Sequence, residues 1–258
     1  QENITEKLQR EDAAICQVLN ADGTPLAVAV PLIHPPIYVA VWRVDVGRVP
    51  LFLMDTDIEV NDPWNRGISA RLYTGDLEQR LRQEIVLGIG GTEVLETLGI
   101  KRFLMHLNEG HAAFALLEQI RDRIHQGLNF QQALERVRNT TIFTTHTPVP
   151  AGHDVFPFYM IEKYFHSYWS ALGLDRDAFL KLGVHPQKPE AGFNMTALAL
   201  RLSKYRNGVS KKHAEVSCRM WQSLWTEFSE GESAIDHITN GVHVPTWIEP
   251  KMQLLLDK

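Results

Sequence analysis

Three short segments of this sequence concentrate side chains that could do chemistry: residues 106–111 (HLNEGH), 144–154 (TTHTPVPAGHD) and 238–245 (ITNGVHVP). Their polar groups are those of His106, Asn108, Glu109, His111, Thr145, His146, Thr147, His153, Asp154, Asn240 and His243. A sugar hydroxyl both donates and accepts hydrogen bonds, so neutral His and Asn side chains beside a carboxylate suit it well. The combination therefore indicates a site for a polyhydroxylated neutral ligand.

Each of these residues, taken singly, has a simpler structural explanation. Asn108 would be explained by capping a helix that begins at Glu109. His111 would be explained by a solvated first helical turn, and His146 by burial at the end of an apolar strand. Asn240 begins an Asn-Gly pair, which is common in tight turns. The ligand hypothesis therefore depends on the whole group, and the structural explanations stay open for each member.

Metal and phosphate-loop chemistry fit the sequence poorly. His106, Glu109 and His111 form an HxxExH pattern, which differs from the HExxH zinc motif and puts the two histidines on different predicted elements. Residues 88–91 (GIGG) follow a predicted helix and lack the GxGxxG spacing, so we expect them to end that helix and to pack closely. The sequence contains no GxSxG, P-loop or CxxC pattern. We therefore expect no bound metal.

The elements that would position the three segments begin with β structure. Two β-prone runs flank Ala21-Asp22-Gly23, and two more flank Asp45-Val46-Gly47, so we predict two hairpins in the first 60 residues. Residues 60–75 are polar and irregular, which indicates a surface loop.

Helical periodicity begins after residue 75. Asp76 with Gln79 resembles a capping box, and Leu77, Leu81 and Ile85 then recur at helical spacing.

Further along the chain, helix-like and strand-like runs alternate. We predict helices over 92–99, 109–124, 155–172, 194–205 and 210–225, and strands over 100–107, 140–147 and 236–242. Residues 206–209 are predicted to be a break between helices, and residues 245–250 a turn or helix start. The alternation predicts an α/β layered fold with a mostly parallel sheet. Ligands bind such sheets beyond the carboxyl ends of the strands, where the three polar segments fall.

Composition excludes several classes of protein. The 258 residues carry a formal net charge of -5, so there is no basic surplus of the kind that nucleic-acid binding requires. No apolar run reaches the roughly 18 residues of a membrane span, and the polar start of the chain has no signal-peptide pattern. Cys16 and Cys218 are far apart and are expected to be unlinked, which favours a cytoplasmic setting.

Several long segments together resemble the α-glucan phosphorylases, most closely the shorter bacterial and archaeal type. The matching segments are RLYTGDLEQRLRQEIVLGIGG, HLNEGHAAFALLEQIR, IFTTHTPVPAGHDVFP, NMTALALRLSKYRNGVSKKHAEVS and ITNGVHVPTW. They occur in the family's order and cover most of residues 66–248, whereas the part before residue 60 matches less distinctly.

The resemblance implies a two-lobed glycosyltransferase of the GT-B type. Residues 1–60 would be a β-rich segment, and residues 61–258 the Rossmann-like α/β part of the glucan-binding N-terminal lobe. The implied reaction is reversible phosphorolysis of terminal α-1,4-glucosidic bonds by inorganic phosphate, which gives glucose 1-phosphate with retention. The implied cofactor is pyridoxal phosphate, bound to a lysine as a Schiff base and acting through its phosphate group, and the implied assembly is a homodimer.

The resemblance also implies roles for particular residues. His146 matches the histidine that hydrogen-bonds the donor glucose near its 6-hydroxyl, and Asn240 matches an asparagine that contacts the same glucose. Thr147 would face the acceptor side, and Glu109 and His111 would line the acceptor subsites. The longer animal and plant enzymes carry Asp where this chain carries Glu109.

Two secondary matches accompany these roles. Residues 66–69 fall near a loop that gates the cleft, and Cys218 stands where a basic residue is expected.

Parts of the family's active site are expected outside these residues. The glycine-rich loop that approaches the substrate phosphate would precede residue 1, and the cofactor lysine and phosphate-binding basic residues would follow residue 258. We therefore expect the isolated chain to be inactive. Two other hypotheses remain: a non-catalytic carbohydrate-binding remnant, and another GT-B glycosyltransferase such as a nucleotide-sugar-dependent synthase.

Overall fold

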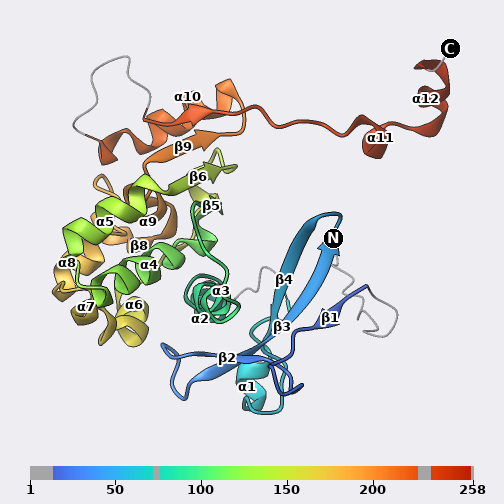
Figure 1. The fold of residues 1–258 in the computed structure, drawn as a ribbon. Helices are drawn as coiled ribbons and strands as arrows, with labels where there is room; N and C mark the ends of the chain where they lie inside the picture. Colours follow the sequence, from blue (N-terminus) through green and yellow to red (C-terminus); the bar gives the residue numbers. More distant parts are fainter. Residues whose placement is uncertain (1–13, 72–75, 226–233, 257–258) are drawn as a thin grey trace.

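The computed structural model describes residues 14–71, 76–225 and 234–256, and it has a mixed α/β architecture with two main sheets. Figure 1 shows helices α2 (Leu77–Ile85) and α3 (Gly91–Thr97) between an antiparallel sheet near the N-terminus and a parallel sheet. On one side α3 contacts the antiparallel sheet, and on the other it contacts α4 (Phe114–His125).

The antiparallel sheet is built around a ten-residue strand, β3 (Ile37–Val46). β4 (Val49–Asp55) returns along one edge of it, and the Val46–Val49 pair closes the turn. Gly47 in that turn has φ of 61°, a conformation that glycine adopts without strain. The second predicted hairpin is therefore confirmed.

The first predicted hairpin is confirmed only near its turn, because the two strands pair mainly with β3. β1 (Cys16–Gln17) and β2 (Ala27–Val30) both pair antiparallel with the free edge of β3, one after the other. The intervening residues turn tightly, since the Asn20 N–H donates to Thr24 O (2.8 Å). The two runs meet briefly at the Leu19–Pro25 bridge, where the Leu26 N–H donates to Val18 O (2.9 Å). β3 is long enough to hold both short strands on one edge.

The predicted surface loop at residues 60–75 is confirmed for most of its described residues, which are exposed, and wrong in two respects. It contains helix α1 (Pro63–Arg66), capped by Asp62, and it buries Asn61, Asn65 and Ile68. Asn61 is buried because its amide satisfies main-chain groups: it accepts from the Tyr38 N–H (2.8 Å) and donates to Tyr38 O (2.7 Å). Polar side chains here fasten the segment to β3.

The helix that begins at α2 does not end at the glycine run, as the sequence analysis expected. It continues through a π-helical turn, η2 (Val86–Gly90), directly into α3. The expectation of close packing is confirmed, because a Cβ on Gly88 would lie 2.7 Å from the Phe114 Cβ and 2.8 Å from the Ala115 nitrogen. The glycines let α4 approach this turn.

The start and the end of this helical segment agree with the sequence analysis only in part. Asp76 caps α2 by accepting from the Glu78 N–H (3.0 Å), but the Gln79 side chain donates to Gly67 O (3.1 Å), so no capping box forms. α3 ends as predicted before Gly99, whose φ is 67°.

The second sheet is parallel, with strand order β10-β9-β6-β5. Its strands are β5 (Met105–Asn108), β6 (Thr141–Thr145), β9 (Tyr205–Gly208) and β10 (Asp236–His237). The helices that connect and follow them are α4, α5 (Phe130–Asn139), α6 (Phe158–Phe165), α7 (Tyr168–Ala171), α8 (Arg176–Lys181), α9 (Met195–Leu202), α10 (Lys211–Trp221), α11 (Val244–Trp247) and α12 (Pro250–Leu256). The predicted α/β fold with a parallel sheet is confirmed.

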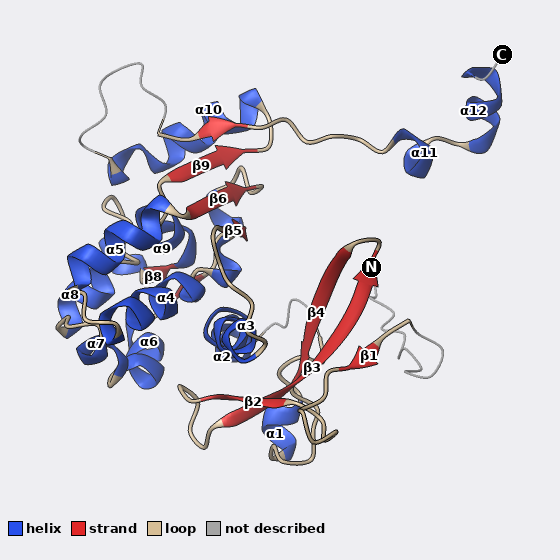
Figure 2. Ribbon diagram, in the orientation of Figure 1, coloured by secondary structure: helices blue, strands red, loops and turns tan. Residues whose placement is uncertain are grey.

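Smaller elements complete the connections. They are the 3-10 turns η3 (Gly110–Ala112), η4 (Pro150–Gly152), η5 (Pro189–Ala191) and η6 (Gln222–Leu224), and the antiparallel pair β7 (Val155–Phe156) and β8 (Phe193–Asn194). Figure 2 shows α11 and α12 at the end of an extended segment that leads away from both sheets.

The predicted break at residues 206–209 is wrong, because β9 is an interior strand of the parallel sheet. Its polar residues are buried with their hydrogen bonds satisfied: Arg206 Nε donates to the carbonyl oxygens of Leu200 and Ser203 (3.0 Å each), and Asn207 Oδ1 accepts from Thr144 Oγ1 (2.9 Å). Helices α5 and α8 were not predicted either.

Two further sequence expectations concern the whole chain. Cys16 and Cys218 keep their thiols and are not bonded to each other, as expected. Among the described helices, none combines the length and the apolar character that crossing a bilayer requires.

Candidate functional site

The carboxyl ends of β5 and β6 bring the first two polar segments together. Asn108 and Thr144 are register partners in the parallel ladder, so the residues that follow each strand lie side by side. Glu109 follows β5, and His146 and Thr147 follow β6. The prediction that these residues lie close together, made from the strand ends, is therefore confirmed.

Glu109 holds this corner of the site in a strained conformation. Its φ of 69° and ψ of 175° belong to a region that glycine occupies almost alone, so the conformation costs of order 1–3 kcal/mol. Its carboxylate Oε1 accepts from the His146 main-chain N–H and from Thr147 Oγ1 (3.0 Å). The contacts join the ends of two strands. Asn108 does not cap the following turn, because Glu109 occupies the N-cap position.

The side chains at this corner remain available to a ligand. The imidazole of His146 is exposed and makes no hydrogen bond with another described residue, so the alternative explanation, burial as a core histidine, is wrong. Glu109 Oε2 likewise has no hydrogen bond within residues 14–71, 76–225 and 234–256. An imidazole and a carboxylate oxygen facing solvent at a sheet edge can bind hydroxyl groups.

His111 lies on η3 and belongs to a charged cluster with residues of two other segments. Its Nδ1 is 2.9 Å from Asp154 Oδ2, 2.9 Å from Arg80 Nη2 and 3.5 Å from Glu84 Oε1. Arg80 also contacts Asp154 (3.1 Å) and Glu84 (3.4 Å). Glu84 is only 2% exposed, so this cluster is partly removed from water.

The cluster shifts the pKa values of its members in different directions. Hydrogen bonds to Asp154 and then to Glu84 raise the pKa of His111 to about 9. Burial raises the pKa of Glu84 to about 8. Burial also opposes ionisation of Asp154, but hydrogen bonds from His111 and Arg80 outweigh it and hold the pKa of that carboxyl well below its usual range. At neutral pH the cluster therefore contains a protonated imidazole, a neutral Glu84 carboxyl and an ionised Asp154.

Three ligand atoms of Glu84, His111 and Asp154 lie within 4.8 Å of one another, as they would around a metal ion. The guanidinium of Arg80 already touches all three residues and supplies the positive charge there. Of the three residues in the HxxExH pattern, only His111 belongs to this cluster. His106 lies 2.8 Å from Thr144 Oγ1 instead.

Arg80 and Glu84 were missed by the sequence analysis, which considered only the apolar face of their helix. Their one sequence signal is an arginine followed four residues later by a glutamate on a predicted helix.

A second row of polar residues supports the site from behind. Thr144 Oγ1 links His106 to Asn207 across three neighbouring strands. His153 is buried, its Nδ1 lies 2.9 Å from Thr196 Oγ1, and burial lowers its pKa. Thr145 is buried as well. The Thr144 and His153 contacts join neighbouring elements, whereas His106 is exposed on β5.

The third polar segment follows β10, which is two strands away from β6 in the parallel sheet. Asn240 is exposed beyond β10, with its main-chain N–H donating to Val209 O (3.1 Å). His243 Nδ1 lies 2.7 Å from Thr246 Oγ1. No hydrogen bond joins either residue to another predicted site residue in the described part of the chain.

Residues 66–69, which the resemblance puts near a gating loop, are hydrogen-bonded to the end of β4. For example, Ser69 Oγ donates to Asp55 Oδ1 (3.0 Å).

A cavity of about 420 Å³ opens between β4 and α2 and reaches the charged cluster. Phe52, Leu53 and Met54 line one wall, and Arg80, Glu84 and His111 line its polar end.

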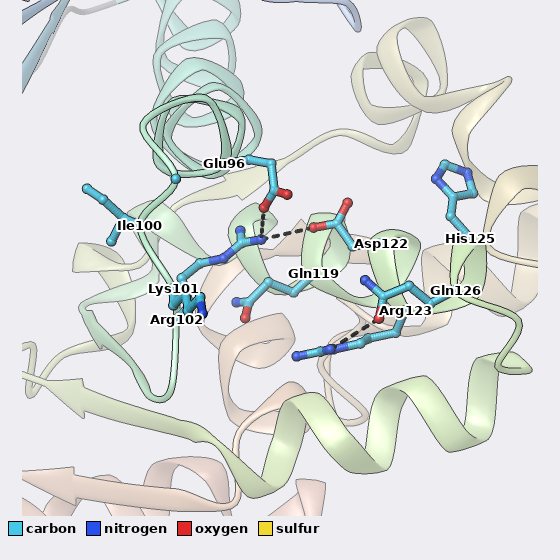
Figure 3. Close-up of a pocket in the computed structure, with 10 residues that line it drawn as sticks. Glu96, Ile100, Lys101, Arg102, Gln119, Asp122, Arg123, His125 and Gln126 are labelled. Atoms are coloured by element: carbon cyan, nitrogen blue, oxygen red, sulfur yellow. Dashed lines mark hydrogen bonds and ion pairs between the residues drawn. The ribbon is translucent and has the colours of Figure 1, made fainter.

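A larger cavity, about 590 Å³, lies between the end of α3 and α4 and contains none of the predicted residues. Figure 3 shows Arg102 reaching Glu96 (2.9 Å) and Asp122 (3.2 Å), so these three charged groups pair with one another.

Comparison with known proteins gives three informative relatives. The chain is 43% identical over its full length to the glycogen phosphorylase of Aquifex aeolicus, covering 37% of that protein. It is 44% identical over 96% of its length to the maltodextrin phosphorylase of Thermococcus litoralis, covering 29% of it. It is 42% identical over 90% of its length to the glycogen phosphorylase of Mycobacterium tuberculosis, covering 28% of it. No protein-family profile matches the chain. The chain thus spans about a third of the length of these curated relatives.

Proposed function

We infer that this chain is a piece of an α-glucan phosphorylase. We propose that the whole protein cleaves terminal α-1,4-glucosidic bonds of glucans with inorganic phosphate and releases glucose 1-phosphate. Identities of 42–44% to proteins named glycogen or maltodextrin phosphorylase support the proposal. The structural observation that carries it is the Glu109 carboxylate holding His146 and Thr147 at the carboxyl edge of a parallel sheet.

The fold proposal follows from the order of the strands. β5, β6, β9 and β10 are parallel and neighbour one another in chain order, as in one half of a Rossmann-like sheet. We propose that residues 61–258 form this part of the glucan-binding lobe of a GT-B enzyme, with residues 1–60 as a β-rich segment attached to it.

Each site residue has a proposed role in glucan binding. His146 hydrogen-bonds the donor glucose with its exposed imidazole, and Asn240 contacts the same sugar from beyond β10. Thr147 faces the acceptor side, where Glu109 and His111 line the acceptor subsites. Glu109 also fixes the turn that carries His146. Groups held rigidly around the bond to be cleaved keep the reacting atoms aligned without further loss of entropy.

The described residues do not fit the cofactor that the resemblance implies. A lysine that forms a Schiff base with pyridoxal phosphate is activated by desolvation in a pocket, and every lysine in the described part of the chain is exposed. We therefore propose that other parts of the protein bind the cofactor and the phosphate. The isolated chain is then inactive, and the active form is proposed to be a cytoplasmic homodimer.

The proposal is tested by incubating the whole protein with pyridoxal phosphate, maltodextrin and inorganic phosphate and measuring glucose 1-phosphate, with a phosphate-free reaction as control. Release that depends on phosphate is the expected result. Consumption of a sugar nucleotide without phosphorolysis would indicate a synthase instead. Maltodextrin binding with neither reaction would indicate a carbohydrate-binding remnant.

A further inference from the structure

The ring of His111 is held from one side only. Three groups crowd its Nδ1, namely Asp154, Arg80 and Glu84, at 2.9, 2.9 and 3.5 Å. Its Nε2 makes no hydrogen bond with any residue that the structure describes, and the side chain is 35% exposed. One ring nitrogen is thus engaged by protein, and the other is open to a ligand.

The chemistry of the neighbours decides where the hydrogen of Nδ1 points. An ionised carboxylate can only accept a hydrogen bond, and a guanidinium can only donate one. Arg80 Nη2 already donates to Asp154 Oδ2 (3.1 Å), and the same oxygen lies 2.9 Å from Nδ1. Arg80 Nη2 also lies 2.9 Å from Nδ1, but the pKa of His111 is raised to about 9, so the ring is protonated at neutral pH. Nδ1 then carries a hydrogen and donates it to Asp154.

We propose that Asp154 is a positioning residue for His111, which fixes the ring with hydrogen on Nδ1 and leaves Nε2 to meet a hydroxyl of the acceptor sugar. Arg80 holds the Asp154 carboxylate in place from α2. The inference rests on the proposed function only for the identity of the sugar. It resembles the arrangement in which a carboxylate orients a catalytic or metal-bound imidazole by taking its second N–H.

Charged groups on α2 and on the segment before β7 support this assignment. Arg80 and Glu84 face it from α2, Asp154 faces it from the segment before β7, and His153 lies close enough for its charge to interact with that of His111. Only Asp154 combines a full negative charge with hydrogen-bond distance. Removing that charge changes the ring's proton affinity, whereas a residue that merely packed against the ring would not.

The first test measures His111 directly in this chain by NMR of its ring nitrogens across a pH titration. In the wild type we expect the doubly protonated imidazolium of His111 to lose a proton at about pH 9. The neutral ring that remains is expected to carry its hydrogen on Nδ1. In Asp154→Asn the pKa falls by about 1–3 pH units, because a nearby opposite charge is lost while the side-chain shape is kept. The matched control is Asp122→Asn, which removes another Arg-bonded carboxylate far from the ring and leaves the titration unchanged.

The second test uses the whole protein and separates substrate binding from chemistry. Asp154→Asn is expected to raise KM for the acceptor glucan about 10-fold, the effect of one hydrogen bond, and to change kcat less. The effect grows with pH, because the variant loses the protonated imidazole earlier than the wild type does.

The two tests fail in distinguishable ways. A wild-type ring with its hydrogen on Nε2, or a pKa that Asp154→Asn and Asp154→Ala leave unchanged, overturns the inference even if phosphorolysis occurs. An unchanged KM with a shifted pKa overturns the role in acceptor binding. The expected NMR result without any phosphorolysis leaves the positioning of His111 intact and counts against the proposed function alone.

Discussion

The carboxylate of Glu109 accepts a hydrogen bond from the main-chain N–H of His146, 37 residues further along the chain. The contact joins the ends of β5 and β6 and fixes the turn from which the His146 imidazole projects. Glu109 makes it from a backbone conformation that only glycine adopts readily, with φ of 69°. Strain of this kind persists where surrounding contacts over-determine it, and it concentrates at functional sites.

Substitution of Glu109 separates the strain from the hydrogen bonds. Glu109→Gly and Glu109→Ala both remove the carboxylate that accepts hydrogen bonds from His146 and Thr147. Only the glycine variant also relieves the strain of the backbone conformation. We expect Glu109→Gly to be more stable than Glu109→Ala by about 1–2 kcal/mol, measured by urea unfolding. Equal stability of the two variants would show that the backbone at this position is not strained.

Close packing at the π-helical turn predicts opposite outcomes for two neighbouring glycines. A methyl group on Gly88 would collide with the Phe114 Cβ and the Ala115 backbone, so Gly88→Ala is expected to lose about 1–3 kcal/mol of stability. Gly91→Ala is the control, since its nearest neighbour is the end of the Met54 side chain at 3.6 Å. That change should be neutral or stabilising by up to about 1 kcal/mol, because alanine favours helix. Similar losses in both variants would contradict the packing.

Glu84 makes the stability of the chain depend on pH. Its pKa is about 8 in the folded chain and 4.5 when unperturbed, so between these values the folded state binds the extra proton. The stabilisation is therefore complete below pH 4.5 and is lost as pH rises through about 8. His111, raised from 6.5 to about 9, loses its contribution in the same direction at higher pH.

Glu84→Gln copies the neutral carboxyl and cannot titrate. Above the pKa of Glu84, we expect the unfolding free energy of Glu84→Gln to exceed that of the wild type by on the order of 2–4 kcal/mol. In acid, we expect the two unfolding free energies to be equal. Thermal unfolding across this pH range measures the effect, with Glu215→Gln on the exposed side of α10 as control. Parallel curves for wild type and Glu84→Gln would show that Glu84 does not carry the dependence.

The sequence predicted the elements whose apolar residues recur regularly, and it failed where polar residues are buried. The stripe of Leu116, Leu117 and Ile120 marked α4, and all three are fully buried. β9 gave no such signal, because Arg206 and Asn207 are buried through hydrogen bonds to partners that the sequence cannot place. The pairing of β1 and β2 with β3 is also a tertiary choice.

The placement of the candidate site residues was also predicted only in part. Glu109, His146 and Thr147 follow strand ends, so the rule for parallel sheets brought them together correctly. Arg80 and Glu84 were not predicted, because they reach the site from a distant part of the sequence. Arg80, for example, is 74 residues before Asp154. The backbone strain at Glu109 and the pKa shifts depend on three-dimensional packing, so a local sequence pattern does not contain them.

The most direct test of the central claim compares glucose 1-phosphate release by the whole protein and by two histidine variants, with maltodextrin, inorganic phosphate and pyridoxal phosphate supplied. His146→Asn is expected to be slower by about 10–100-fold, since the proposed role of His146 is a hydrogen bond to the donor glucose and the exposed position leaves folding unaffected. His166→Asn, also exposed but at the end of α6, is expected to match the wild type. No glucose 1-phosphate from the wild type, or equal rates for the His146 and His166 variants, would contradict the account.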